Sequence, residues 1–194
     1  MADTTAVALL GRVRAGSPAA LSQLVERFSP RLLAVIRLRL GPSLRAHLES
    51  RDVLQETWLK AIARFEGFAG AGPASFMAWV AQIAANEIRD RVDYHGRQRR
   101  DGAREERLEP AELDGLAARV RSETSRLALS AEMTRLERAL EALSPDHREV
   151  IVLRKLEERS FGEVAERMGR SPDACRVLLA RALAALAVEM DRPA

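Results

Sequence analysis

Side chains suited to binding nucleic acid gather near the C-terminus of this chain. The following positions recur at helical spacing on one side of a potential helix: Arg170, Ser171, Asp173, Arg176, Val177, Ala180 and Arg181. Guanidinium groups pair with guanine edges in the major groove and with phosphates along the backbone. The pattern therefore predicts a helix that docks on duplex DNA, with Arg181 near a phosphate.

Residues for other chemistry are sparse. The lone cysteine, Cys175, excludes an internal disulfide and is expected to be a small buried residue, while the three histidines lie far apart without a second ligand at metal spacing. Paired carboxylates, nucleophile–base sets and phosphate loops are missing at functional spacing, and the Gly70–Gly72 stretch is too short for a dinucleotide fingerprint. We expect no metal, no cofactor and no enzymatic activity.

Composition favours an all-α fold. The chain has 194 residues, 47% of them hydrophobic but only 4% aromatic, which leaves little material for a sheet. The net charge of +3 does not by itself indicate a nucleic-acid partner. The apolar run at the N-terminus is too short for a signal peptide, and none approaches the roughly 20 residues of a membrane span. We expect a cytoplasmic protein without membrane insertion.

Apolar periodicity predicts helices in the first half of the chain. The first covers residues 18–40 and stops at Gly41-Pro42, and the second begins after Ser50 as N-cap. One side of this second helix is apolar, and the other carries Asp52, Gln55, Glu56 and Lys60. Residues 66–75 form a glycine-rich loop, and a third helix covers 76–92 with Trp79 expected in the core.

The composition then changes. Residues 96–130 are rich in Arg, Glu, Gly and Asp, which predicts a charged linker, although the same charges could be a solvated helix face. Strong helical periodicity returns from residue 131. We therefore expect two small helical domains, 1–95 and 131–194, joined by a linker at 96–130.

Caps predict a helix-turn-helix in the second domain. Ser144-Pro145 and Ser171-Pro172 each combine an N-cap with proline at the first helical position, and Ser160 with Glu163 forms a capping box. The helix from Ser160 must then end near Met168, followed by a turn at 169–171. That geometry presents the next helix to the major groove; the alternative is an ordinary bundle with tight turns.

In order and spacing, residues 52–65 (DVLQETWLKAIARF), 76–92 (FMAWVAQIAANEIRDRV) and 143–186 resemble the sigma-70 family of RNA polymerase sigma factors, extracytoplasmic-function (ECF) type. The resemblance implies that 1–95 is sigma region 2, which binds core polymerase and the −10 element. It implies that 131–194 is a winged-helix-like, four-helix sigma region 4, which binds the −35 element.

The resemblance also assigns roles to individual residues. The positions expected to bind core polymerase are Asp52, Gln55, Glu56 and Leu59. Those expected to bind the melted −10 strand are Phe76, Asn86, Arg89, Asp90, Arg97, Arg99 and Arg100. The −35 reader is the C-terminal set from Arg170 to Arg181, and whether Phe65 and Phe68 contact DNA stays open.

The implied partners are core RNA polymerase, promoter DNA and an anti-sigma protein. The chain departs from the family pattern at Val177 and Leu178, where many relatives carry a serine and a basic residue. Few basic contacts predict weak independent binding to DNA. A stand-alone helix-turn-helix regulator and an inactive sigma-like module that binds an anti-sigma protein therefore remain as alternatives.

Overall fold

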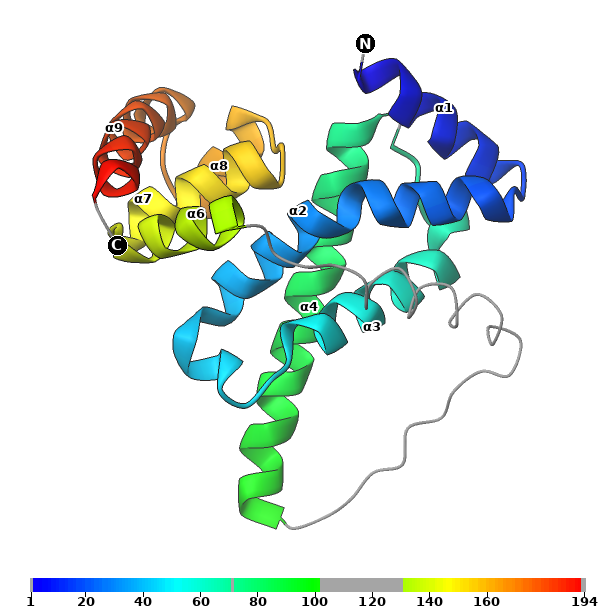
Figure 1. Ribbon diagram of the computed structural model, residues 1–194, viewed down its shortest axis with the longest axis horizontal. Coiled ribbons are helices and arrows are strands. Elements are labelled where there is room, and N and C mark those ends of the chain that lie inside the picture. The colour runs from blue at the N-terminus through cyan, green and yellow to red at the C-terminus, as the bar shows by residue number, and fades with distance from the viewer. Residues whose placement is uncertain (1, 71, 102–130, 193–194) are drawn as a thin grey trace.

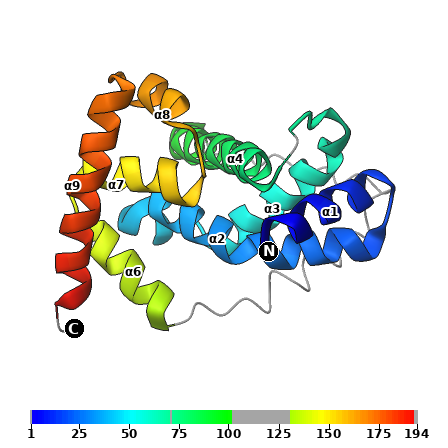
Figure 2. The same ribbon diagram turned by 90° about the horizontal axis from the view of Figure 1, so that it is seen from above.

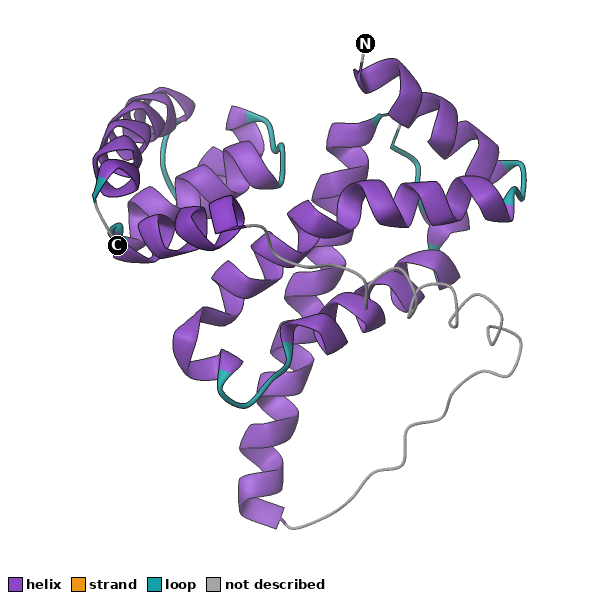
Figure 3. Ribbon diagram, in the orientation of Figure 1, coloured by secondary structure: helices purple, strands orange, loops and turns teal. Residues whose placement is uncertain are grey.

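The computed structural model describes residues 2–70, 72–101 and 131–192, and the regular elements in those ranges are helical, without a strand. Figure 3 shows this architecture, which confirms the all-α prediction. In the same ranges, no helix combines the length and apolar character needed to span a bilayer.

The N-terminal bundle contains α1 (Ala2–Arg14), α2 (Pro18–Arg45), α3 (Ser50–Ala63) and α4 (Pro73–Asp101). Figure 1 shows α2 crossing α4, with α3 beside both. The apolar stripe of α2 is buried through Leu24, Leu32 and Ile36. The buried Trp58 indole of α3 donates to Ser29 Oγ at 2.9 Å. Burial of these large side chains is the main contribution to the stability of the bundle.

Several boundaries differ from the predicted ones. Glu49, not Ser50, is the N-cap of α3, and Ser50 is its first residue. Gly41 breaks the helical geometry of α2 with φ 63° and ψ 172°, as expected, but a helical stretch resumes up to Arg45. The predictions did not include α1, which buries Leu9 and Leu10 against α2.

The C-terminal end of α4 also differs from expectation. The helix continues to Asp101, beyond the predicted domain limit at residue 95. Arginine and glutamine, which occupy all of 97–100, are good helix formers and outweigh the single Gly96. The remainder of the predicted linker, 102–130, lies outside the described residues.

The C-terminal bundle contains α6 (Ala131–Ala142), α7 (Pro145–Ile151), a π-helical turn η3 (Val152–Leu156), α8 (Phe161–Met168) and α9 (Pro172–Asp191). The predicted caps are confirmed. Ser171 Oγ accepts from the Ala174 amide at 3.2 Å, and Ser160 with Glu163 forms the complete capping box. Gly169 ends α8 in the left-handed conformation, φ 63°, which glycine adopts without strain.

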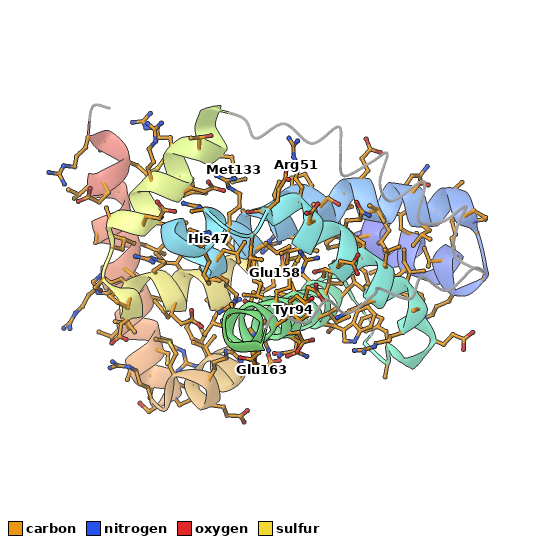
Figure 4. The ribbon with its side chains drawn as sticks, turned by 90° about the horizontal axis from the view of Figure 1, so that it is seen from below. His47, Arg51, Tyr94, Met133, Glu158 and Glu163 are labelled. Atoms are coloured by element: carbon orange, nitrogen blue, oxygen red, sulfur yellow. The ribbon has the colours of Figure 1, made fainter. Side chains whose placement is uncertain are left out.

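The two bundles meet along α2, a contact that the sequence reasoning did not anticipate. Figures 1 and 2 both place the C-terminal bundle next to α2, which contacts α6 and η3, and Glu158, labelled in Figure 4, lies at this junction. Four arginines of α2 form ion pairs with glutamates of the C-terminal bundle. We call this set the α2 arginine row: Arg31, Arg37, Arg39 and Arg45.

The most enclosed pair in this junction joins Arg39 to Glu157, whose side chain is 2% exposed. Arg39 Nε donates to Glu157 Oε1 at 3.0 Å, and the other carboxylate oxygen accepts from Arg159 Nε at 2.7 Å. Burial opposes the charge on Arg39, but Glu157 and Glu149 outweigh it, so the pKa of Arg39 lies above its usual value. Arg37 holds Glu137 with its Nε 2.7 and 2.8 Å from the two carboxylate oxygens.

Candidate nucleic-acid interface

The predicted DNA-facing side of α9 is on the surface. Every residue of the predicted set from Arg170 to Arg181 is exposed, including Val177 at 52%. The opposite side is anchored by Cys175, Leu179 and Ala182, which are buried at i, i+4 and i+7. Cys175 is therefore the small core residue that was expected.

Two of the arginines on this side are held by neighbours. Arg176 forms an ion pair with Asp173, and its guanidinium lies 5.1 Å from the centre of the Phe161 ring. Arg154 lies 5.0 Å from the same ring, so two cations stack on one aromatic side chain. Arg170 pairs with Asp146 at 2.5 Å. The aspartates offset part of the positive charge, so this surface is only weakly basic.

The polar side of α3 carries the residues expected to bind core polymerase. Asp52 is exposed, and Gln55, Glu56 and Leu59 are half-buried. Their spacing of three and four places them on one face, opposite the buried Val53 and Trp58. This arrangement gives α3 a continuous acidic and amide surface.

The polar side of α4 carries Asn86, Arg89 and Asp90. Asn86 is half-buried and its Oδ1 accepts from Gln82 Nε2 and from Arg89 Nη1, both at 3.2 Å. Arg89 and Asp90 are exposed. The surface therefore offers guanidinium and amide donors together with a carboxylate acceptor.

Four further residues were predicted to bind the −10 strand, namely Phe76, Arg97, Arg99 and Arg100. The side chains of Arg97, Arg99 and Arg100 lie outside the described part of the chain.

The prediction for Phe76 is wrong, because its side chain is 1% exposed. Its ring packs 5.2 Å from that of Phe28, 5.4 Å from Phe68 and 5.8 Å from Trp79. Phe76 lies one residue before Met77 and four before Val80, which are both buried, so it falls on the inward side of α4. Trp79 is half-buried in this aromatic cluster, in agreement with the predicted core role.

A buried carboxylate joins α3 to α4, and the sequence reasoning missed it. Glu87 accepts from Lys60 Nζ and from Arg91 Nε, each at 2.6 Å. Burial alone would raise the pKa of Glu87, but the hydrogen bonds and charges of these two cations hold it below the usual value. The i,i+4 spacing of Glu87 and Arg91 was the available signal. This ion cluster fixes the polar faces of α3 and α4 relative to each other.

Arg14 makes a second connection that the sequence did not indicate. Its Nη2 donates to the carbonyl of Phe68 at 3.0 Å and to that of Gly70 at 2.7 Å. The guanidinium also lies 5.6 Å from the centre of the Phe68 ring. The end of α1 therefore holds the backbone that leads towards α4, over a sequence separation that no local pattern reveals.

The C-terminal bundle touches α4 beside its polar side. Arg159 Nη2 donates to Gln82 Oε1 at 3.3 Å, and Gln82 in turn binds Asn86. In this arrangement, part of the surface around Asn86 is occupied by the chain itself.

Comparison with known proteins finds two matched regions in the chain. The family described as Sigma-70 region 2 matches residues 24–98, and that described as Sigma-70, region 4 matches residues 133–186. The chain is 34% identical over 166 residues to the RNA polymerase sigma factor CarQ of Myxococcus xanthus, covering 86% of each chain.

Two further proteins extend the comparison. The ECF RNA polymerase sigma-E factor of Salmonella typhimurium is 30% identical over 159 residues, covering 81% of this chain and 79% of that one. The solved structure of CnrH in complex with the cytosolic domain of CnrY is similar at a TM-score of 0.53 and 26% identity, covering 96% of this chain and 97% of that one. With its region 2 and region 4 matches and these relatives, the chain belongs to the sigma-70 family of RNA polymerase sigma factors, in the ECF group.

Proposed function

We propose that this protein binds core RNA polymerase and directs it to promoters, reading the −35 duplex with α9 and capturing the melted −10 strand with α4. The observation that carries the proposal is the surface of α9, where the polar face of a capped helix-turn-helix is exposed while Cys175, Leu179 and Ala182 are buried. Residues 1–95 and 131–194 are the proposed functional domains.

The proposed contact with polymerase is the face of α3 that carries Asp52, Gln55, Glu56 and Leu59. An acidic and amide surface is complementary to a basic partner, which guides association and fixes its orientation. The names of the relatives CarQ and sigma-E associate those proteins with RNA polymerase, and we extend that partner to this chain.

For the −10 strand we propose Asn86, Arg89 and Asp90. Extruded bases expose hydrogen-bonding edges, which amide and carboxylate groups can read, while guanidinium groups neutralise phosphates. Because Phe76 is in the core, base stacking by that residue has no part in the proposal.

For the −35 duplex we propose Arg170, Arg176 and Arg181 as the cationic contacts, with Ser171, Asp173, Val177 and Ala180 between them. Asp146 and Asp173 offset two of these charges in the free protein. Affinity for duplex DNA that rests on few phosphate contacts is low and falls with salt. We therefore propose that polymerase supplies most of the affinity of the complex for the promoter.

The junction along α2 sets a condition on this function. Arg159 contacts Gln82 on the same helix as the proposed −10 residues. We propose that the two bundles separate when polymerase and promoter are bound. We also propose an anti-sigma protein as a partner of the inactive form; the similar CnrH was solved with the cytosolic domain of another protein.

The proposal is tested by mixing the purified protein with core polymerase and measuring complex formation by fluorescence anisotropy. We expect binding below micromolar concentration, and a loss of more than tenfold for Asp52→Arg. Asp191→Arg, a charge reversal at the exposed end of α9, is the matched control. Without a complex at micromolar concentration the polymerase role fails, and binding of a specific duplex by the protein alone would favour a stand-alone regulator.

A further inference from the structure

The end of α1 contacts a glycine-rich segment that leads into α4. We define this segment as residues Gly67 to Gly70. It starts at the last residue of η1 (Phe65–Gly67) and precedes the first turn of α4. Arg14, the last residue of α1, reaches it across 54 and 56 residues of sequence, with hydrogen bonds to the carbonyls of Phe68 and Gly70. α1 lies before residue 24, where the region 2 match begins, so that match assigns it no role.

The segment has one anchor on its inner side. The Phe68 side chain is 6% exposed, and its ring centre lies 5.0 Å from that of Trp79. Gly70 passes so close to this ring that a Cβ on it would lie 2.5 Å from two ring atoms and 2.8 Å from Ser75 Cβ. Only glycine fits at this approach, because any side chain would push the ring or the backbone aside.

Arg14 supplies the anchor on the outer side. Glycine residues lose much conformational freedom on ordering, so a segment with Gly67 and Gly70 at its ends needs external contacts to keep one conformation. One guanidinium satisfies two carbonyls and stacks over the Phe68 ring at 5.6 Å. The backbone is thereby fixed between the aromatic cluster below and a cation above.

We infer that Arg14 is a positioning residue for strand capture, holding the Gly67–Gly70 segment in the conformation that promoter opening requires. The inference rests on the proposed function, because α4 is the proposed −10 reader and the Gly67–Gly70 segment precedes the first turn of α4. It adds α1, through one side chain, to the parts of the chain that determine how efficiently a promoter is opened.

The test has two independent readouts. Hydrogen exchange of the free protein follows the peptide that covers residues 65–70, where the Gly67 and Phe68 amides donate to Arg64 and Phe65 carbonyls. Permanganate reactivity measures promoter opening. The promoter used is the fragment that the wild-type holoenzyme opens most strongly in a selection from random fragments. The variants are Arg14→Met and Arg14→Lys, with Arg12→Met as the control for charge, since Arg12 is an exposed arginine of the same helical turn.

We expect Arg14→Met to speed exchange in this peptide and to lower opening about tenfold, from the loss of two charge-assisted hydrogen bonds. Binding to core polymerase should not change. Arg14→Lys should be intermediate because an ammonium cannot reproduce the guanidinium fork, and Arg12→Met should match wild type. Gly70→Ala, which perturbs the same segment from its inner side, should lower opening without removing Arg14.

Other outcomes overturn the inference. Exchange in Arg14→Met equal to that of wild type would mean that no positioning takes place. An equal loss of opening in Arg12→Met would mean that only charge matters. If the wild-type holoenzyme opens no fragment, the proposed function fails, and the role in opening fails with it; faster exchange in Arg14→Met would then identify a purely structural contact.

Discussion

Replacing Arg39 with methionine should separate the C-terminal bundle from α2. Methionine keeps most of the aliphatic stem but leaves Glu157, 2% exposed, with Arg159 as its remaining close cationic partner. Removing one member of a buried ion pair costs about 3–5 kcal/mol when the other charge stays buried. Because Arg159 still holds one carboxylate oxygen, we take the lower end, about 3 kcal/mol, which is roughly a hundredfold shift towards the separated form.

A second substitution tests the cause of this shift. In Arg39→Met with Glu157→Gln, the uncompensated charge is gone, and the bundles should return towards the closed arrangement relative to Arg39→Met alone. The control is Arg192→Met, which removes an exposed ion pair within the C-terminal bundle. Exposed pairs contribute about 0.2–1 kcal/mol each, so this control should leave the junction closed.

Distances between spin labels measure the separation directly. Ala63 at the end of α3 and the 64% exposed Val188 on α9 are suitable label positions, with Cys175 replaced by alanine to remove the natural thiol. Wild type should give one narrow distance population and Arg39→Met a broad one. If both give the same distribution, or if the double variant is more open than the single one, the ion-pair account of the junction is refuted.

Three further predictions concern stability and DNA binding. Ser160→Ala should lower the free energy of unfolding by about 1 kcal/mol in chemical denaturation, because it removes the capping box of α8. Glu87 has a lowered pKa in the fold, so its contribution to stability is complete above about pH 4.5 and is lost as the pH falls through the folded value; Glu87→Gln should flatten the acid limb of an unfolding titration. Arg181→Ala should weaken holoenzyme binding to a −35 duplex and reduce the slope of log affinity against log salt by about 1. A slope unchanged within error would remove Arg181 from the phosphate contacts.

Local chemistry was sufficient to predict the helix-turn-helix. Ser160, Gly169 and Ser171 satisfy backbone groups within three residues of themselves or relieve strain at a single position, so their effect is visible in the sequence. The exposed side of α9 was predicted from helical spacing, with the Ser171 cap marking the start of the helix. Membership of the sigma-70 family was likewise predicted from the order of three segments.

Contacts between distant segments could not be predicted in this way. Arg14 meets the Phe68 carbonyl, and Arg39 meets Glu157, only because whole helices pack together. An exposed-looking arginine in a helix has the same local pattern whether or not it finds such a partner. Phe76 was misassigned because the family resemblance gave it a role at the −10 strand, whereas its position four residues before Val80 and seven before Ile83 puts its ring on the buried side of α4.

The most direct test of the proposed function is to map transcript starts from the holoenzyme. Core polymerase with and without this protein is given a library of random duplex fragments, and the 5′ ends of the transcripts are sequenced. We predict starts that depend on the protein, share upstream −10 and −35 motifs, and weaken with Asn86→Ala or Arg181→Ala. Starts that are identical with and without the protein, although the complex with core polymerase forms, would contradict a role in promoter recognition.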